Sequence, residues 1–424
     1  MRQGVTGAVL AAVLGMALPA GAAGIDKKAV LTTYADIAHA KYEDSLTAAG
    51  ALKAAVNALV ASPGEATLKA AREAWVASRV PYQQSEAYRF GNANVDAWEG
   101  KVNAWPLDEG LIDYVNADSY GAESGENPLY TANVIANKSL KIAGKPVNAT
   151  KISKKLLAET LHEAGEVEAN VATGYHAIEF LLWGQDLNGT GAGNGSRPHT
   201  DFDVKNCTGG NCDRRVAYLV TATDLLIDDL KAMVAQWAPK GKARAQLLKA
   251  DPDAGIGRIV TGLGSLSYGE LAGERMKLGL MLHDPEEEHD CFSDNTHNSH
   301  FYDAKGIQNV YLGSYTRIDG RTVAGPGLSS LVAAKDAGLD ADMRAKLDGT
   351  MRAMGVLVTT AEGGEAYDQM IGAENPSGNA KVQAAIDALV AQTRTLEKAV
   401  AMLALGDVKF EGSDSLDNPD AVGK

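Results

Sequence analysis

Cysteine is scarce in this sequence, because the chain of 424 residues contains only three. No CxxC pair occurs among them, which argues against a metal centre built on cysteine pairs. Aromatic residues are also few, at 6%. Beyond the N-terminal segment, no stretch reaches the ~20 apolar residues that a membrane-spanning helix needs. We therefore expect neither a thiolate metal site nor a transmembrane span.

Basic residues are too few to balance the acidic ones. The chain has 40 Lys and Arg against 54 Asp and Glu, for a net charge of -14. Such a charge repels phosphate backbones and anionic membrane surfaces, which argues against nucleic acid as a partner. It suits a soluble protein that attracts cations.

The first residues have the pattern of a signal peptide. A short charged start, Met1–Gln3, precedes the apolar run Ala8–Leu18, and Ala20-Gly21-Ala22 matches an A-x-A cleavage site. We predict that residues 1–22 are a signal peptide and that the mature protein is exported. The expected location is periplasmic or associated with the outer membrane.

Export makes the cysteines informative, because disulfides persist in oxidising compartments. Cys207 and Cys212 bracket a turn-rich Thr-Gly-Gly-Asn segment, and a short-loop disulfide between them is the first expectation, leaving Cys291 free. The alternative pairs Cys291 with one of the other two, and the sequence does not choose between these pairings.

Apolar residues recur at alternating three- and four-residue steps through most of the mature chain, which predicts amphipathic helices. The pattern predicts an all-α fold of two helical bundles packed side by side. A Gly-, Asn- and Pro-rich connection, 185–211, separates them, so we expect an N-terminal bundle over 23–200 and a C-terminal bundle over 201–424. The expected helices cover about 28–61, 66–90, 153–183, 213–238, 256–282, 299–311, 328–337, 341–357 and 381–405.

Two polar residues interrupt the apolar face of the predicted helix that ends at Trp183. His176 and Glu179 are three residues apart, a spacing that puts both side chains on one helical face. A buried His and Glu either bind each other or bind something else, because leaving them unpaired in a core is costly. The pair is therefore a candidate metal site, with a plain hydrogen-bonded pair as the alternative.

Other polar residues lie among apolar ones elsewhere. Arg79 and Glu86 share a helical face with two aromatic residues, which indicates either a salt bridge or the wall of a polar pocket. Residues 283–300 hold four of the eight histidines and many acids without any periodicity. Within them, Ser293 and Asp294 are residue types that cap helices or bind ligands.

Three blocks of sequence resemble the imelysin-like family. They are GYHAIEFLLWGQD, with a GxHxxE motif, EAWVASRVPYQQSEAYRFG followed by VNAWPLDEGLIDYV, and GERMKLGLMLHDPEEEHDCFSDNTHNSHFYDAKGIQNVYLG. The resemblance implies an all-α fold. Matched position by position, it implies that the metal ligands are His176, Glu179, Glu86 and Asp108. Further residues of these blocks are predicted to contact a bound group, namely Arg79, Arg275, Ser293 and Asp294.

The resemblance leaves three functional classes open. We rank a metal-binding uptake protein first, with iron favoured and zinc possible, working with an outer- or inner-membrane transport component. One His with several carboxylates suits iron better than a thiolate site would. A module that binds a peptide, haem or siderophore in a cleft ranks second. A metallopeptidase, the family's original label, ranks third, because the chain has no HExxH motif and no nucleophile motif.

Overall fold

The structure is a computed structural model that describes residues 25–422. The predicted signal peptide lies outside these residues. Within them, helices dominate and the strands form only two small two-stranded sheets, which confirms the predicted all-α class. None of the described helices combines the length and the apolar character needed to cross a membrane.

The α-helices are α1 (Lys27–Ala61), α2 (Glu65–Gln83), α3 (Ala93–Asn103), α4 (Ala117–Tyr120), α5 (Lys154–Leu156), α6 (Gly174–Trp183), α7 (Cys212–Trp237), α8 (Lys242–Lys249), α9 (Pro252–Ser265), α10 (Leu278–Leu282), α11 (Thr296–Leu312), α12 (Leu328–Lys335), α13 (Ala337–Glu362), α14 (Tyr367–Ile371), α15 (Pro376–Leu403) and α16 (Asp414–Asp417). Two π-helical segments are η3 (Leu157–Leu161) and η6 (Leu266–Lys277). The 3-10 segments are η1 (Glu86–Tyr88), η2 (Glu109–Leu111), η4 (Ala164–Glu166), η5 (His199–Phe202), η7 (Pro285–Glu287) and η8 (Pro419–Ala421). The antiparallel strand pairs are β1 (Ser139–Ile142) with β2 (Lys145–Asn148), and β3 (Ser314–Thr316) with β4 (Thr322–Ala324).

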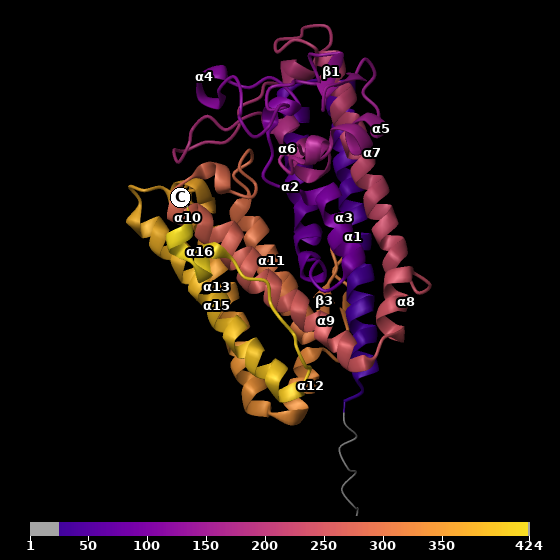
Figure 1. Cartoon of the computed structure of the whole chain (residues 1–424), viewed down its shortest axis with the longest axis vertical. Coiled ribbons are helices and arrows are strands. Elements are labelled where there is room, and N and C mark those ends of the chain that lie inside the picture. The colour runs from indigo at the N-terminus through magenta and orange to yellow at the C-terminus, as the bar shows by residue number, and fades with distance from the viewer. Residues whose placement is uncertain (1–24, 423–424) are drawn as a thin grey trace, which may run out of the picture.

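The first bundle is built around α1, which packs along α2 and α7 (Figure 1). The side chain of Asp26 caps the start of α1 by accepting a hydrogen bond from the backbone of Lys28, at 2.9 Å. The apolar stripe predicted from the sequence is buried along this helix, including Tyr42, Leu52 and Leu59. α3 and α6 complete the bundle by packing against α7 and against each other.

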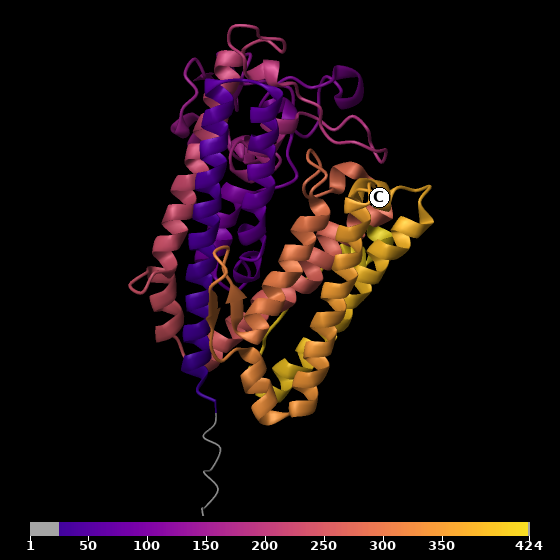
Figure 2. The same ribbon diagram turned by 180° about the vertical axis from the view of Figure 1, so that it is seen from behind.

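The second bundle consists of α9, η6 and the helices that follow, and it lies beside the first (Figures 1 and 2). α13 and α15 pack along each other, and α15 also packs on η6. α11 joins the two bundles, because it contacts α13 on one side and α2 on the other. The predicted side-by-side arrangement of two bundles is therefore present.

The connection between α6 and α7 does not coincide with a change of bundle. α7 and α8 follow residue 200, yet they pack against α1. The division of the chain into domains over 23–200 and 201–424 stays a prediction.

The sequence predicts a helix over 153–183, with a break and a fresh N-cap at Thr173-Gly174 as the alternative. α6 does begin there, but the chain before it is also interrupted. Regular helix stops at His162, and positive φ angles occur at Glu163, Gly165 and Glu166. The side chain of Asn170 donates to the carbonyl of Ala164 at 2.7 Å and so holds this turn. Apolar residues of the turn also face the core, so their spacing in the sequence resembles that of a continuous helix.

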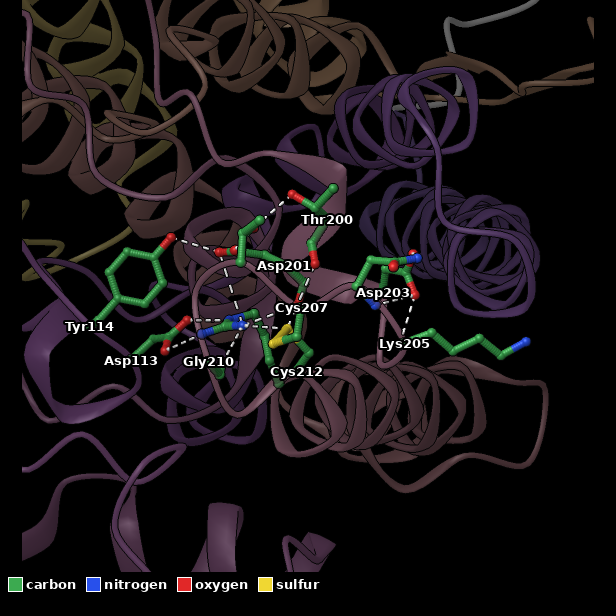
Figure 3. Close-up of a disulfide and its surroundings, with 12 residues drawn as sticks. Asp113, Tyr114, Thr200, Asp201, Asp203, Lys205, Cys207, Gly210 and Cys212 are labelled. Carbon is green, nitrogen blue, oxygen red and sulfur yellow. Dashed lines mark hydrogen bonds and ion pairs between the residues drawn. A yellow bond between two sulfur atoms is a disulfide. The ribbon is translucent and has the colours of Figure 1, made fainter.

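The expected disulfide between Cys207 and Cys212 is present, and Cys291 is free. Figure 3 shows the disulfide beside Asp113, Tyr114 and Asp201. Arg215, one turn into α7, bonds both carboxylate oxygens of Asp113 at 2.6 and 3.0 Å. The ion pair thus holds the start of α7 to Asp113, and the disulfide joins it to the preceding loop.

Candidate metal centre

The helix that carries the GxHxxE motif, α6, lies in the core with all ten of its residues buried. It begins at Gly174, whose φ of +83° belongs to the left-handed region. A Cβ at this position would lie 2.5 Å from the carbonyl oxygen of Val102, so only glycine fits. The hydroxyl of Thr173 donates to Lys101 at 2.9 Å. These contacts fix the rotation of α6 and hence the direction of its polar side chains.

His176 and Glu179 contact each other, as their spacing predicts. His176 Nδ1 lies 3.0 Å from Glu179 Oε2. The other oxygen of Glu179 accepts two hydrogen bonds from Ser293, one from the backbone at 3.0 Å and one from the hydroxyl at 2.6 Å. Ser293 thus touches the GxHxxE pair directly and ties the segment before α11 to α6.

Two residues that the sequence did not single out complete the cluster. His176, His289 and Asp290 are all buried, and each has one potential ligand atom within 4.8 Å of those of the other two. The rings of His176 and His289 are 4.8 Å apart between centroids. Asp290 Oδ1 lies 3.9 Å from His176 Nδ1 and 3.6 Å from His289 Nδ1. The three residues therefore form a compact set of two imidazoles and one carboxylate.

Arg79 supplies the positive charge beside this set. Its Nη2 donates to Asp290 Oδ1 at 2.9 Å and lies 3.5 Å from His289 Nδ1. The guanidinium also stands 5.0 Å from the ring centroid of Tyr175. The second oxygen of Asp290 accepts hydrogen bonds from Asn295 and Ser299. The predicted wall residue Arg79 is thus the direct partner of Asp290.

The protonation states favour metal binding. Burial would raise the pKa of Asp290, but the charge of Arg79 and the hydrogen bonds of Asp290 outweigh it and hold the pKa below its ordinary value. Burial, followed by the charge of Arg79, lowers the pKa of His176 to about 3. Burial also lowers the pKa of His289 well below its ordinary value. Two neutral imidazoles and the ionised carboxylate of Asp290 therefore suit a cation. Burial, followed by the charge of Asp290, raises the pKa of Glu179 well above its ordinary value.

One buried atom in the cluster lacks a partner. His176 Nε2 has no hydrogen-bond partner among the described residues. Because Nδ1 is bonded to Glu179, Nε2 is the ring nitrogen of His176 that remains for a metal ion. Buried polar atoms are rarely left without a partner, so the residues present fit a metal ion.

Glu86, a predicted ligand, has other partners. It is buried and bonds Arg275 Nη2 at 2.9 Å. Arg275 also bonds Asp303 at 3.0 Å and Glu270 at 2.7 Å. Burial would lower the pKa of Arg275, but these three carboxylates raise it well above its ordinary value. Glu86 belongs to no group of potential metal ligands within the described chain. The predicted roles of Glu86 and Arg275 in binding stay predictions.

Asp108 and Asp294 are not among the potential ligands grouped with His176 in the described chain. Asp108 accepts a hydrogen bond from Asn127 and lines a cavity of about 440 Å³ together with Trp105 and Cys291. Asp294 belongs to a second group of carboxylates. Their assignment to one shared site with His176 therefore stays a prediction.

A cleft gives access to His289. It has a volume of about 590 Å³ and is lined by residues of α3 and η6, which belong to different bundles. Seven carboxylate side chains and two arginines face it, with Trp105 and His289 on its wall. The ring of Trp105 packs edge-on against that of His289, with centroids 5.8 Å apart. The excess of acids attracts cations toward His289.

Residues 38–396 match the model of the imelysin family. The chain belongs to that family. The match covers most of both bundles and every residue of the candidate metal centre, including the GxHxxE helix. The predicted resemblance is thereby confirmed.

Two individual proteins are similar to this imelysin-family chain. A crystal structure from Parabacteroides distasonis, named as an iron-regulated protein A precursor, superposes with a TM-score of 0.62 over 90% of this chain and 97% of that one, at 18% identity. This likeness concerns the fold. Iron-regulated protein A of Synechococcus elongatus is 38% identical over 63 residues, which are 14% of this chain and 18% of the relative. The chain therefore matches less than a fifth of that relative's length.

The sequence did contain a signal for His289 and Asp290. Both lie in the segment 283–300, where histidines and acids are dense without periodicity. Such density indicates a functional segment but does not show which of its side chains face the site, because an irregular segment has no helical face from which to infer contacts. Only the packing of this segment on α6 identifies which of its residues meet His176.

Proposed function

We propose that this protein binds iron through His176, His289 and Asp290 and serves iron acquisition at the cell envelope. The observation that carries the proposal is the compact group of two neutral imidazoles and one ionised carboxylate. Two imidazoles with one carboxylate are a characteristic donor set for ferrous iron. The names of the two similar proteins, both iron-regulated, support the choice of iron.

Glu179 acts in this proposal as the partner that orients His176. Metal-binding histidines commonly donate their second ring nitrogen to a carboxylate, which fixes the ring and raises its basicity. The 3.0 Å contact between His176 and Glu179, itself held by Ser293, supports this role. Zinc would be accepted by a similar donor set and is the competing metal.

Arg79 limits how tightly the site holds a cation. Its guanidinium already neutralises Asp290, so a metal ion shares that carboxylate with a neighbouring positive charge. Repulsion between the two cations weakens metal binding. A weakened site suits a protein that must release its cargo to a transport component of the inner or outer membrane, which we propose as its partner. Export through residues 1–22 belongs to the same proposal.

The size of the cleft favours a second candidate function. A volume of about 590 Å³ exceeds what a lone ion occupies and falls in the range of small-molecule sites. A metal complex such as haem or a siderophore could rest there with its metal toward His289. In this second candidate function, Arg275, which lines the cleft, contacts the organic part of the haem or siderophore.

Anaerobic equilibrium dialysis against ferrous iron tests the proposal. Wild-type protein should bind one ion at this site, and His176→Ala and His289→Ala should each weaken binding by about tenfold or more. His39→Ala is the matched control, because His39 pairs with Glu43 on the exposed side of α1 at 3.7 Å. Equal affinity in wild type and both site variants would overturn the assignment.

Thermal melts separate a metal site from a purely structural pair. If the cluster binds iron, the metal raises the Tm of wild type but not that of His176→Ala. If His176 only bonds Glu179, the variant loses roughly 1–3 kcal/mol with or without iron. Binding of an iron complex but not of free iron would favour the cleft-binding function instead.

A further inference from the structure

A second group of ligand atoms lies on the other side of the segment that carries His289 and Asp290. It consists of Glu288, which follows η7, Asp294, in the turn before α11, and Asp368, in α14. One carboxylate oxygen of each lies within 4.8 Å of those of the other two. Glu288 and Asp368 are each only 1% exposed. Three carboxyl groups from three separate parts of the chain are therefore held together in a largely buried place.

These carboxylates have little in the protein to satisfy them. Four of their six oxygens are buried without a hydrogen-bond partner within the described chain, including both oxygens of Asp368. No ion pair among the described residues includes any of the three. The nearby hydroxyl of Tyr367 is also buried without a partner. Isolated buried carboxylates are costly unless protons or a cation neutralise them.

The charges around the cluster add to the repulsion. Burial, followed by the charges of Asp368 and Asp294, raises the pKa of Glu288 well above its ordinary value. Burial, followed by the charges of Asp368 and Asp186, raises the pKa of Asp294 to about 8. Each carboxyl group thus lies near further carboxyl groups, where a basic side chain would be the expected partner. Such an arrangement either holds protons or holds a metal ion.

We propose that Glu288, Asp294 and Asp368 bind a hard divalent cation, of which Ca²⁺ is the best match. Carboxylate oxygens are the donors that such cations prefer. Oxygens bound to Ca²⁺ at about 2.3–2.6 Å can lie up to roughly 5 Å apart, and the separations of at most 4.8 Å fall within that limit. The site is separate from the His176 cluster and does not rest on the proposed iron-binding function.

Binding at this place has a structural consequence. The segment 288–294 runs from one cluster to the other, because Glu288 and Asp294 enclose His289, Asp290 and Ser293. A cation that draws Glu288 and Asp294 onto α14 holds both ends of this segment. It therefore also holds the side chains that face His176.

Isothermal titration calorimetry of the metal-free protein with Ca²⁺ and with Mg²⁺ tests the site. Wild type should bind Ca²⁺, and Asp368→Asn and Glu288→Gln should each weaken that binding by about tenfold or more. Asp407→Asn, an exposed carboxylate in the loop after α15, is the matched control and should bind as wild type does. His176→Ala should also keep its Ca²⁺ binding, which separates this site from the iron site.

Three results would overturn the inference. The first is a wild-type protein that binds neither Ca²⁺ nor Mg²⁺, in which case protons compensate the cluster. The second is unchanged Ca²⁺ affinity in both Asp368→Asn and Glu288→Gln, which would locate the ion elsewhere. The third is binding of ferric iron alone by these residues. A wild-type protein that binds neither cation overturns the inference even if a variant fails to fold.

Discussion

His176 Nδ1 lies 3.0 Å from Glu179 Oε2, and both side chains are almost completely buried. The two residues are about one helical turn apart. In the sequence they interrupt an otherwise apolar helical face. What the pair does depends on the residues that face it from outside α6, above all His289, Asp290 and Arg79.

The contributions of Arg79 and Asp290 to the free energy of unfolding should be coupled. Arg79→Met leaves a buried carboxylate without its partner and should cost about 3–5 kcal/mol in metal-free protein. The double variant Arg79→Met with Asp290→Asn should lose clearly less than the sum of the two single changes. Urea unfolding of the four proteins measures this coupling, and strictly additive losses would show that the two groups do not depend on each other.

The start of α6 should not tolerate a side chain. Gly174→Ala places a Cβ against the backbone of Val102 at a positive φ, and we expect a loss of about 2 kcal/mol or more. Gly50→Ala is the control, because Gly50 lies in α1 with open space around it. That change should be neutral or stabilising by about 0.5–1 kcal/mol. Equal urea midpoints for the two variants would show that the close approach of Gly174 does not matter.

Glu109 should make stability depend on pH. Burial, followed by the charge of Glu286, raises the pKa of Glu109 to about 8. The folded chain holds this proton more tightly than the unfolded chain. The stabilising contribution is therefore complete below the ordinary pKa of 4.5 and is lost as the pH rises to about 8.

Glu109→Gln should remove that loss, because the amide stays neutral. The wild-type free energy of unfolding should fall by up to about 1.4 kcal/mol per pH unit from this group, so the variant should be the more stable protein at pH 8. Near pH 5 the two should differ little. Urea titrations at both pH values provide the check, and parallel pH profiles would show that Glu109 is ionised in the folded chain.

The fold was largely predictable because helical periodicity is a local property. α1 spans Lys27–Ala61 against an expected 28–61, and α7 begins at Cys212 against an expected 213. One error fell at 153–173, where apolar residues keep a helical spacing although Gly165 and Asn170 form a turn. The expected helices also lacked α3 and α8. Tertiary packing there overrides the local pattern.

The site was predictable only where it lies on one helix. His176 and Glu179 share a face by their spacing alone, whereas the contact between Asp290 and Arg79 joins positions 211 apart in sequence. Glu86 illustrates the same limit: its burial followed from the apolar stripe, but its partner Arg275 comes from η6 in the other bundle. A polar residue on a buried face indicates that a partner exists without identifying it.

Anomalous diffraction at the iron edge, from crystals grown anaerobically with ferrous iron, would locate the bound metal. We predict a strong peak in contact with His176, His289 and Asp290, and its loss in crystals of His289→Ala. A peak confined to Glu288, Asp294 and Asp368 or to the protein surface, or no peak at all, would contradict it.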